Sequence, residues 1–368
     1  MENKPIRVLV SSLSRDFGGV ESLFLDLCQY RDPSKITFDF LCSDQSAARE
    51  QDFLKTGAKV YHLPRPSKDK KGYLDRVNEI LDKGNYQIFH MNMTRYYYPA
   101  AAALAKKKGL RIILHSHSTR IYKTKSIVIN FVRQIEQIVF RPITLRISDA
   151  NIACSKTAGE YLFGKREYQV IYNGIDLSKY RYSIEDRKQI RKEFNIPDDA
   201  FVLGHVGRFS LEKNHEYLLN VFKEVNHIHT NSMLICIGSG DLINQVKERA
   251  ERLGLSNKIV FTGLRNDIPA LLSAMDVFVF PSVHEALPMT LIEAQANGLP
   301  CVVSESVTRE ILANKNLYFL ELSAGAESWA KVIDNESRIT RSSASYQLEQ
   351  FSINTMLNKL LDLYKNFS

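Results

Sequence analysis

The chain has 368 residues, of which 44% are apolar and 24% are charged, and its formal net charge is +8. This composition is ordinary for a globular protein, and no apolar run approaches the length needed to span a bilayer. Because the chain is longer than one hydrophobic core usually supports, we expect two domains.

The cysteines and the first residues of the chain bear on its compartment. The chain starts Met-Glu-Asn-Lys-Pro and leads directly into an apolar run, without the apolar core and cleavage site of a signal peptide. The cysteines are scattered through strand-like runs and show no paired spacing, so we expect buried free thiols in a reducing compartment. They are Cys28, Cys42, Cys154, Cys236 and Cys301. We therefore expect a cytoplasmic protein.

Apolar runs typical of buried strands recur in the first half of the chain and alternate with segments of helical periodicity. The expected strands are 6–10, 36–42, 59–63, 88–91, 111–115, 151–154 and 169–172. The expected helices include 20–30, 47–56, 73–83 and 97–108. Such alternation indicates a parallel sheet with helices on both faces.

The same alternation begins again after a polar, charged stretch at 177–199. Strands are expected there at 201–206, 233–238, 258–262, 277–280, 301–304 and 318–322. The fold class is therefore α/β, with two doubly wound Rossmann-like domains at 1–180 and 181–345. Ligands of such folds bind outside the carboxyl ends of the strands, so we expect the loops there to line one cleft between the domains.

Two carboxylates, Glu285 and Glu293, bracket a short run between a strand and a Gly-Leu-Pro turn. Pro288 suits the first turn of a helix, which places Glu285 in the preceding loop and Glu293 inside the helix. On one straight helix they would lie about 12 Å apart and be rotated by roughly 80°, too far to share one proton or metal. Free amides at the helix start offer an anion site between them. The order along the chain is therefore a carboxylate, an anion site and a second carboxylate. It suits the sugar, the phosphates and the ribose of a nucleotide diphosphate sugar.

The run from Pro281 to Pro300, in the form Pro-Ser-x-x-Glu…Leu-Ile-Glu-Ala-x-Ala-x-Gly-x-Pro, resembles the signature of the retaining glycosyltransferases of family four, which have the two-domain GT-B fold. The resemblance extends through most of the chain. It includes Gly18-Gly19-Val20-Glu21, Asn173-Gly174-Ile175-Asp176 and Gly207-Arg208…Glu212-Lys213-Asn214. One departure is Ala286, where the family usually has glycine, and a methyl group there could crowd the approach of backbone to sugar.

The resemblance implies a role for each matching residue. Arg208 and Lys213 would bind the diphosphate and stabilise charge on the leaving group. Glu285 would bind sugar hydroxyls and Glu293 the ribose. His117, chosen over His115, would lie against the donor sugar without acting as a base. The remaining donor-binding residues would be Gly18, Gly19, Gly207, Gly238, Leu264, Arg265, Leu287, Met289, Thr290 and Leu291.

Plainer interpretations stay open for several of these positions. Two loop cations can simply be exposed, strand–helix turns need glycine in any case, and a histidine at a strand end is more often structural than catalytic. The chain has no Asp-x-Asp triplet, which enzymes that hold the donor through a divalent metal usually need. We therefore expect no metal and no cofactor, with Arg208 and Lys213 in the place of the metal.

Positive charge is concentrated in the first half of the chain. Residues 1–180 contain 29 Lys and Arg against 18 Asp and Glu, and 101–148 contains ten basic residues and one acidic residue, Glu136. This asymmetry indicates an anionic partner, or a solvated basic surface without one. The segment 126–141 has apolar residues at helical spacing. They either pack inside the first domain or enter a membrane interface, where lysines 106–108, 123 and 125 would add attraction to anionic lipid.

The last segment, 346–368, is apolar at helical spacing. By resemblance it crosses back to the first domain, and by pattern alone it could equally cap the second.

The sequence thus predicts a metal-independent retaining glycosyltransferase. It would move a sugar from a nucleotide diphosphate donor, a UDP-sugar, to a saccharide acceptor that is lipid-linked, in capsule or exopolysaccharide synthesis. The protein would be cytoplasmic and peripheral at the inner membrane face. The alternatives are a nucleotide-sugar epimerase of the same fold and a non-catalytic partner subunit. Nucleic acid is not expected as a partner, because the aromatics do not alternate with the basic cluster in a recognition pattern.

Overall fold

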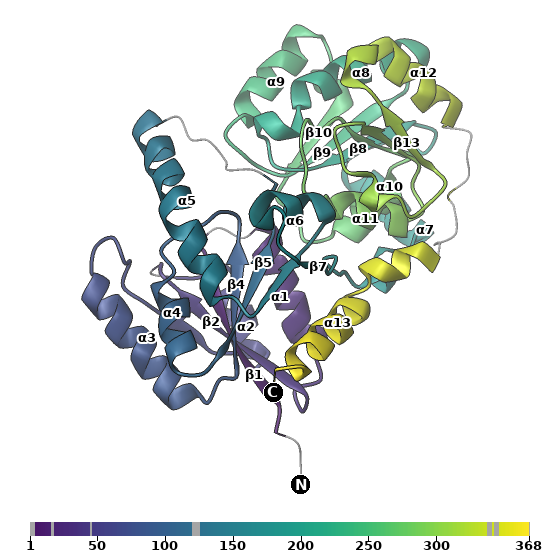
Figure 1. Cartoon of the computed structure of the whole chain (residues 1–368). Helices are drawn as coiled ribbons and strands as arrows, with labels where there is room; N and C mark the ends of the chain where they lie inside the picture. The colour runs from purple at the N-terminus through teal and green to yellow at the C-terminus, as the bar shows by residue number, and fades with distance from the viewer. Residues whose placement is uncertain are drawn as a thin grey trace. The chain divides into compact units, whose positions relative to one another are not determined.

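A computed structural model describes residues 4–15, 18–44, 46–119, 126–336, 341 and 346–367. Contacts divide the chain into two compact units, Met1–Ile175 with Ser352–Ser368, and Asp176–Phe351. Each unit contains one sheet in which all paired strands are parallel (Figure 1). The predicted class, two doubly wound α/β domains, is confirmed.

The sheet of the first unit has seven strands in the order β3-β2-β1-β4-β5-β6-β7. Their bounds are β1 Ile6–Leu13, β2 Ile36–Cys42, β3 Val60–His62, β4 Ile88–Met93, β5 Arg111–Ser116, β6 Ala150–Ala153 and β7 Gln169–Val170. All seven predicted strands are present, and the outermost ones, β3 and β7, are shorter than expected. The carboxyl ends of these parallel strands lie at one edge of the sheet.

The helices of the first unit connect these strands. Their bounds are α1 Gly19–Tyr30, α2 Glu50–Lys55, α3 Lys70–Gly84, α4 Ala100–Lys107, α5 Ile127–Ile147, α6 Lys156–Phe163 and α13 Ile353–Lys365. In Figure 1, α1 and α13 lie together on one side of the sheet, and α3 and α4 lie on the other. Because helices cover both faces of the sheet, its strands are buried on both sides. This explains the continuous apolar runs in the sequence.

The C-terminal helix α13 belongs to the core of the first unit. Its apolar residues at helical spacing are buried with those of the sheet and α1, and they are Ile353, Met356, Leu357, Leu360 and Tyr364. The chain enters the helix through a backbone hydrogen bond from Ile353 N to Ile175 O at 2.9 Å. The Tyr364 hydroxyl lies 2.6 Å from Nδ1 of His90 on β4. Burial of one helical face, rather than helix propensity, therefore holds α13 in place.

Helix α5 differs from the other helices in what it leaves exposed. Of its 21 residues, only Thr144 and Leu145 are buried. Nine large apolar side chains are between 45% and 84% exposed, and they are Ile127, Val128, Ile129, Phe131, Val132, Ile135, Ile138, Val139 and Ile143. The interpretation in which the apolar face packs inside the first domain is wrong. Lysines 123 and 125 lie outside the described residues.

The sheet of the second unit has six strands in the order β10-β9-β8-β11-β12-β13. Their bounds are β8 Val202–Val206, β9 Met233–Ile237, β10 Ile259–Gly263, β11 Val277–Phe280, β12 Cys301–Ser304 and β13 Leu317–Leu320. The helices are α7 Ile184–Glu193, α8 His215–Ile228, α9 Ile243–Arg252, α10 Ile268–Ala274, α11 Met289–Ala296 and α12 Ala326–Glu336. Short 3-10 helices include η1 Leu177–Tyr180 and η2 Leu211–Lys213. All six predicted strands are present.

The five cysteines are buried and unpaired, as expected. None of the described helices is long and apolar enough to cross a membrane.

Shortening Leu360 to Ala should lower the free energy of unfolding by about 2–5 kcal/mol, because its fully buried side chain leaves a cavity in the first unit. The single tryptophan, Trp329, is buried in the second unit. The midpoint of unfolding followed by circular dichroism should therefore shift more than the midpoint followed by Trp329 fluorescence, which reports on the second unit. Asn358→Ala, on the exposed side of the same helix, is the control, and an equal loss in both variants would contradict this account of α13.

Candidate active site

The predicted donor-binding residues of the second unit follow four neighbouring strands, β10, β9, β8 and β11. Because these strands are parallel, the loops after them leave the sheet at one edge. Gly207 and Arg208 follow β8, Gly238 follows β9, Leu264 follows β10, and Glu285 follows β11. Ligands of doubly wound sheets bind at this edge.

Backbone hydrogen bonds fix three of these loops side by side. Gly207 N donates to Ile237 O at 3.0 Å, and Gly238 N donates to Gly263 O at 2.9 Å. Gly238 has φ +135°, and a Cβ on it would lie 2.1 Å from Gly207 O. Only glycine fits this close approach of two backbones. The predicted glycines thus shape the edge of the sheet.

The loops after β8 and β11 are joined by an ion pair between two predicted residues. Lys213 Nζ lies 2.7 Å from Glu285 Oε1, and the two side chains are only 17% and 16% exposed. The ammonium group also lies 4.6 Å from the centroid of the Phe280 ring, and Val283 N donates to Glu212 O at 2.9 Å. The sequence assigned Lys213 to phosphate and Glu285 to sugar. The structure brings the two side chains into direct contact.

Arg208 differs from Lys213 in its surroundings. Its side chain is exposed, and no carboxylate pairs with it in the part of the chain that the structure describes. It follows Gly207 directly, and a Cβ on Gly207 would lie 3.1 Å from Lys213 Cδ. The loop after β8 therefore carries two cations, one held by a carboxylate and one available to an anion.

The helix after β11 begins one residue later than expected. Pro288 is extended, with φ −76° and ψ 98°, and α11 starts at Met289. Glu285 lies in the loop before the helix and Glu293 within it, as predicted. The Tyr180 hydroxyl donates to Glu293 Oε1 at 3.1 Å, which orients this carboxylate from η1.

Two hydroxyls near the start of α11 are buried without a hydrogen-bond partner among the described residues. They are Thr290 Oγ1, which was predicted, and Ser282 Oγ, which was not. A buried hydroxyl without a partner is costly, so both are suited to a polar ligand. The predicted Leu287 and Leu291 are buried, at 8% and 0% exposure, so their side chains belong to the core.

The turn after β10 offers its backbone rather than a charged side chain. Arg265 donates to both oxygens of Glu193, at 2.7 and 3.1 Å, and to both oxygens of Asp267, at 2.8 and 2.7 Å. The hydrogen bonds to Asp267 and Glu193 raise the pKa of Arg265. Leu264 beside it is 80% exposed. The guanidinium of Arg265 is therefore already paired, whereas Leu264 is accessible to a ligand.

In the first unit, the predicted Gly18-Gly19 turn is closed by a buried carboxylate. Glu21 is 7% exposed, and its two oxygens accept from Gly18 N at 3.1 Å and from the Ser14 hydroxyl at 2.8 Å. The amide of Gly18, one of the predicted donor-binding residues, is therefore already occupied by Glu21. Glycine at this position allows the Glu21 carboxylate to approach the backbone closely, and it does not leave a free N–H donor.

The predicted histidine, His117, is partly exposed and lies next to the buried histidines His90 and His115 of the first unit. His90 Nε2 lies 3.1 Å from His115 Nδ1, and the rings of His115 and His117 have centroids 3.9 Å apart. His117 Nε2 donates to Asn92 Oδ1 at 3.0 Å, and its Nδ1 is buried without a partner among the described residues. Burial lowers the pKa of His90 and of His117 to about 3. A neutral His117 can accept a hydrogen bond from a hydroxyl at Nδ1, and its low pKa makes it a weak base.

The second unit has its own pair of neutral histidines beneath the site. His205 on β8 and His215 at the start of α8 have ring centroids 4.8 Å apart, and three of their four ring nitrogens are buried without a hydrogen bond to the described residues. Burial lowers the pKa of His215 to about 4 and that of His205 well below its usual value. Sequence reasoning missed both, because nothing in the pattern separates them from core residues.

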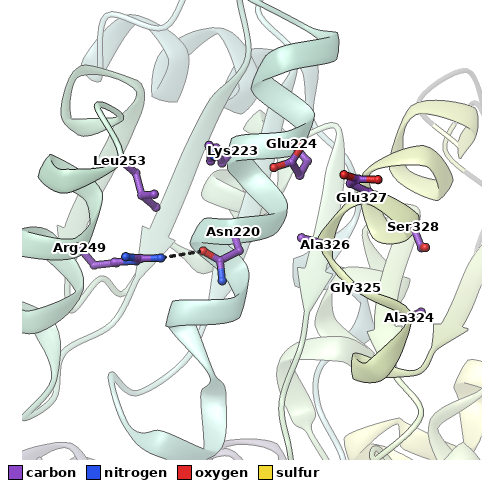
Figure 2. A pocket seen from close by; sticks show the side chains of 10 residues that line it. All are labelled: Asn220, Lys223, Glu224, Arg249, Leu253, Ala324, Gly325, Ala326, Glu327 and Ser328. Carbon is purple, nitrogen blue, oxygen red and sulfur yellow. Dashed lines mark hydrogen bonds between the residues drawn. The ribbon is translucent and has the colours of Figure 1, made fainter.

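A different hollow of the second unit contains none of the predicted residues. It has a volume of about 460 Å³ and lies between α8, α9 and the start of α12 (Figure 2). Lys223 and Arg249 line it together with Glu224 and Glu327, so opposite charges balance. Arg249 Nη2 also donates to Asn220 Oδ1 at 3.4 Å. Among the described residues, no three His, Cys, Asp or Glu side chains form a group that could hold a metal ion.

Two α/β domains, each built on one parallel sheet, match the GT-B fold of glycosyltransferases. Residues 17–179 match the profile of Glycosyltransferase Family 4, and residues 186–335 match that of Glycosyl transferases group 1. The chain is 30% identical to the putative glycosyltransferase EpsF of Bacillus subtilis, over 90% of this chain and 88% of the relative. The chain belongs to the family 4 glycosyltransferases.

Two further comparisons agree with this assignment. The chain is 25% identical, over 94% of its length and 93% of the relative, to the UDP-Gal:alpha-D-GlcNAc-diphosphoundecaprenol alpha-1,3-galactosyltransferase of Escherichia coli. The crystal structure of Anabaena Alr3699/HepE in complex with UDP and glucose has a TM-score of 0.78 at 19% identity, covering 98% of this chain and 99% of that one. The latter shows the shared GT-B fold.

The stability of the second unit should fall as pH decreases from about 6.5. The unfolded chain protonates its histidines below this pH, whereas His205 and His215 stay neutral in the folded state until much lower pH. The unfolded state then binds more protons, and the free energy of unfolding falls with a slope approaching about 1.4 kcal/mol per pH unit for each imidazole. Denaturation followed by Trp329 fluorescence between pH 7.5 and 5 measures this slope.

His215→Leu should remove about half of the slope. His227→Asn, at a side chain that is 63% exposed, is the control and should leave the slope unchanged. A flat profile in the wild-type protein would contradict the neutral state of both histidines.

Proposed function

We propose that this glycosyltransferase moves a sugar from a UDP-sugar to a hydroxyl of a lipid-linked saccharide, with retention at the anomeric carbon, in the cytoplasm at the inner face of a membrane. The observation that carries the proposal is the Lys213–Glu285 ion pair at the carboxyl edge of the second sheet, close in the chain to Arg208, which forms no ion pair with a described residue. The E. coli relative named above uses a UDP-galactose donor and a diphosphoundecaprenol acceptor. The Vi polysaccharide biosynthesis protein VipC/TviE of Salmonella typhi, 28% identical over 52% of this chain and 36% of the relative, supports a role in polysaccharide synthesis, which we place in capsule or exopolysaccharide assembly.

In the proposed reaction the bond between the anomeric carbon and the donor phosphate breaks, and a bond from the acceptor oxygen to that carbon forms on the same face. The acceptor proton passes to an oxygen of the leaving diphosphate. Arg208 and Lys213 stabilise the negative charge on that diphosphate, without a metal ion. Glu285 binds hydroxyls of the sugar, Glu293 binds the ribose, and His117 accepts a hydrogen bond from the sugar.

Removing either cation should slow transfer strongly. Arg208→Ala and Lys213→Ala are each expected to lower kcat/KM for a UDP-sugar by about 10²–10³, the usual loss when one group that stabilises developing charge is removed. Glu285→Gln should also lower it, because Gln cannot pair with Lys213. Transfer of a radiolabelled sugar to an extract of polyprenyl-linked saccharides measures the effect.

Lys188→Ala, at an exposed position of α7, is the control and should keep full activity. If Glu285→Gln and Arg208→Ala both kept full activity, the assignment of the site would be wrong. If the wild-type protein were stabilised by UDP but transferred no sugar to any acceptor, the non-catalytic subunit suggested by Ala286 would be favoured. Release of UDP without acceptor would favour the epimerase, which the comparisons do not favour.

The membrane part of the proposal is supported by helix α5. Nine exposed apolar side chains on one helix are more than a soluble surface usually tolerates as one patch. The segment 101–148 around it carries ten basic residues and one acidic residue, and that residue, Glu136, is paired with Arg95. An apolar helix face with basic neighbours is typical of a helix that lies in the headgroup layer.

The wild-type protein should therefore sediment with vesicles that contain phosphatidylglycerol and less with vesicles of phosphatidylcholine, and binding should weaken as salt is raised. Phe131→Ser combined with Ile138→Ser should abolish most of the binding, since their side chains are 61% and 76% exposed. Leu54→Ser, at an exposed leucine of α2, is the matched control. Binding that did not depend on anionic lipid would contradict this part of the proposal.

A further inference from the structure

We propose that a hollow at the C-terminal end of α5 is a binding site for the anionic headgroup of a membrane phospholipid. This inference rests on the function proposed above and names a specific site for its membrane partner. The hollow has a volume of about 510 Å³. Its lining comes from the last turns of α5 and from the residues at the end of α6, and it consists of Arg141, Pro142, Leu145, Phe163, Lys165 and Arg166.

The lining joins positive charge to an apolar floor. Arg141, Lys165 and Arg166 supply three cations, and no carboxylate is part of the lining. None of the three forms an ion pair with a residue in the described part of the chain. Arg166 Nη1 donates to Leu145 O at 3.2 Å, which holds its guanidinium against the end of α5 and leaves other N–H groups for a phosphate. Such a site suits a phosphate bonded to a small apolar group.

The hollow continues the exposed apolar face of α5. Ile138, Arg141, Pro142 and Leu145 are spaced i, i+3, i+4 and i+7, so they lie on one face of the helix. Phe131 and Ile135 extend that face towards the start of α5, at 61% and 45% exposure. Figure 1 shows α5 extending past the sheet of its own unit. The apolar residues would enter the acyl layer while the hollow lies at the level of the phosphates.

The charges favour a lipid surface over a second copy of the chain. A copy would bring the same excess of basic residues to the contact, and like charges repel. An anionic bilayer supplies an apolar layer and negative headgroups at the same time, and each basic residue near it contributes about 1 kcal/mol. We therefore assign the α5 face and the hollow to one partner, an anionic phospholipid membrane.

The test compares two double variants that remove the same charge. The hollow variant, Lys165→Gln with Arg166→Gln, removes two cations from the lining. The control, Lys59→Gln with Lys71→Gln, removes two exposed lysines elsewhere in the first unit. With vesicles of equimolar phosphatidylglycerol and phosphatidylcholine, the hollow variant should lose about tenfold or more in partition coefficient. The control should lose about twofold at most, because its charges lie outside the site.

Soluble probes separate a headgroup site from general attraction. Dihexanoylphosphatidylglycerol below its micelle concentration should shift amide resonances of Phe163 and Lys165 in a saturable way in the wild-type protein, and not in the hollow variant. Inorganic phosphate should bind at least tenfold more weakly, because it leaves the apolar floor uncovered. Three results would each overturn the proposal. They are an equal loss of vesicle binding in both double variants, inorganic phosphate that binds as tightly as the lipid, and self-association through α5 that depends on protein concentration.

Failure of this inference can be told apart from failure of the proposed function. The hollow variant should keep its rate of sugar transfer to a soluble, short-chain acceptor, since none of the hollow residues is placed in the donor site. If it binds vesicles like the wild type and transfers normally, the headgroup site is wrong and the function stands. If the wild type transfers nothing while the lipid still binds at the hollow, the function is wrong and the site stands.

Discussion

The ion pair between Lys213 and Glu285 is the side-chain contact on which the geometry of the candidate site in the second unit depends. It joins the loop after β8 to the loop after β11 at 2.7 Å, next to a backbone contact between Val283 and Glu212. Two half-buried charges in this position must stay paired with each other or with a ligand, because an unpaired buried charge is costly. A substrate that offers hydroxyls and phosphate together can satisfy both. In the reaction proposed above, the sugar phosphate of the donor is such a substrate.

Histidines of both units lie in largely buried positions near the carboxyl ends of the strands, and they are neutral there. In the first unit His90, His115 and His117 are neutral and form hydrogen bonds or ring contacts with one another and with Tyr364. A neutral imidazole can donate and accept without the desolvation cost of a charge. Tyr364 comes from the C-terminal helix, so the end of the chain supports the strand ends near His117.

Helix α5 has the opposite relation to its surroundings. Burying a large apolar side chain contributes about 1.5–3 kcal/mol, and α5 forgoes this for nine of them within the chain. The helix is instead attached through a few polar contacts, such as those of Gln137 with Tyr96 and Glu136 with Arg95. A face of this kind can act only through a partner, and an anionic lipid surface is the partner proposed above.

The sequence by itself determined the order of strands and helices, the two-sheet class and the turns that carry Gly207, Arg208, Lys213 and Glu285. Periodicity and glycine placement reflect local geometry, which each segment specifies on its own. Only the tertiary structure decided that Lys213 pairs with Glu285, that Glu21 occupies the Gly18 amide, that Arg265 is fully paired and that α13 packs with β4. These contacts join residues far apart in the chain. The face that α5 leaves exposed was likewise undetermined, because an apolar helical stripe has the same sequence pattern whether a core or a membrane covers it.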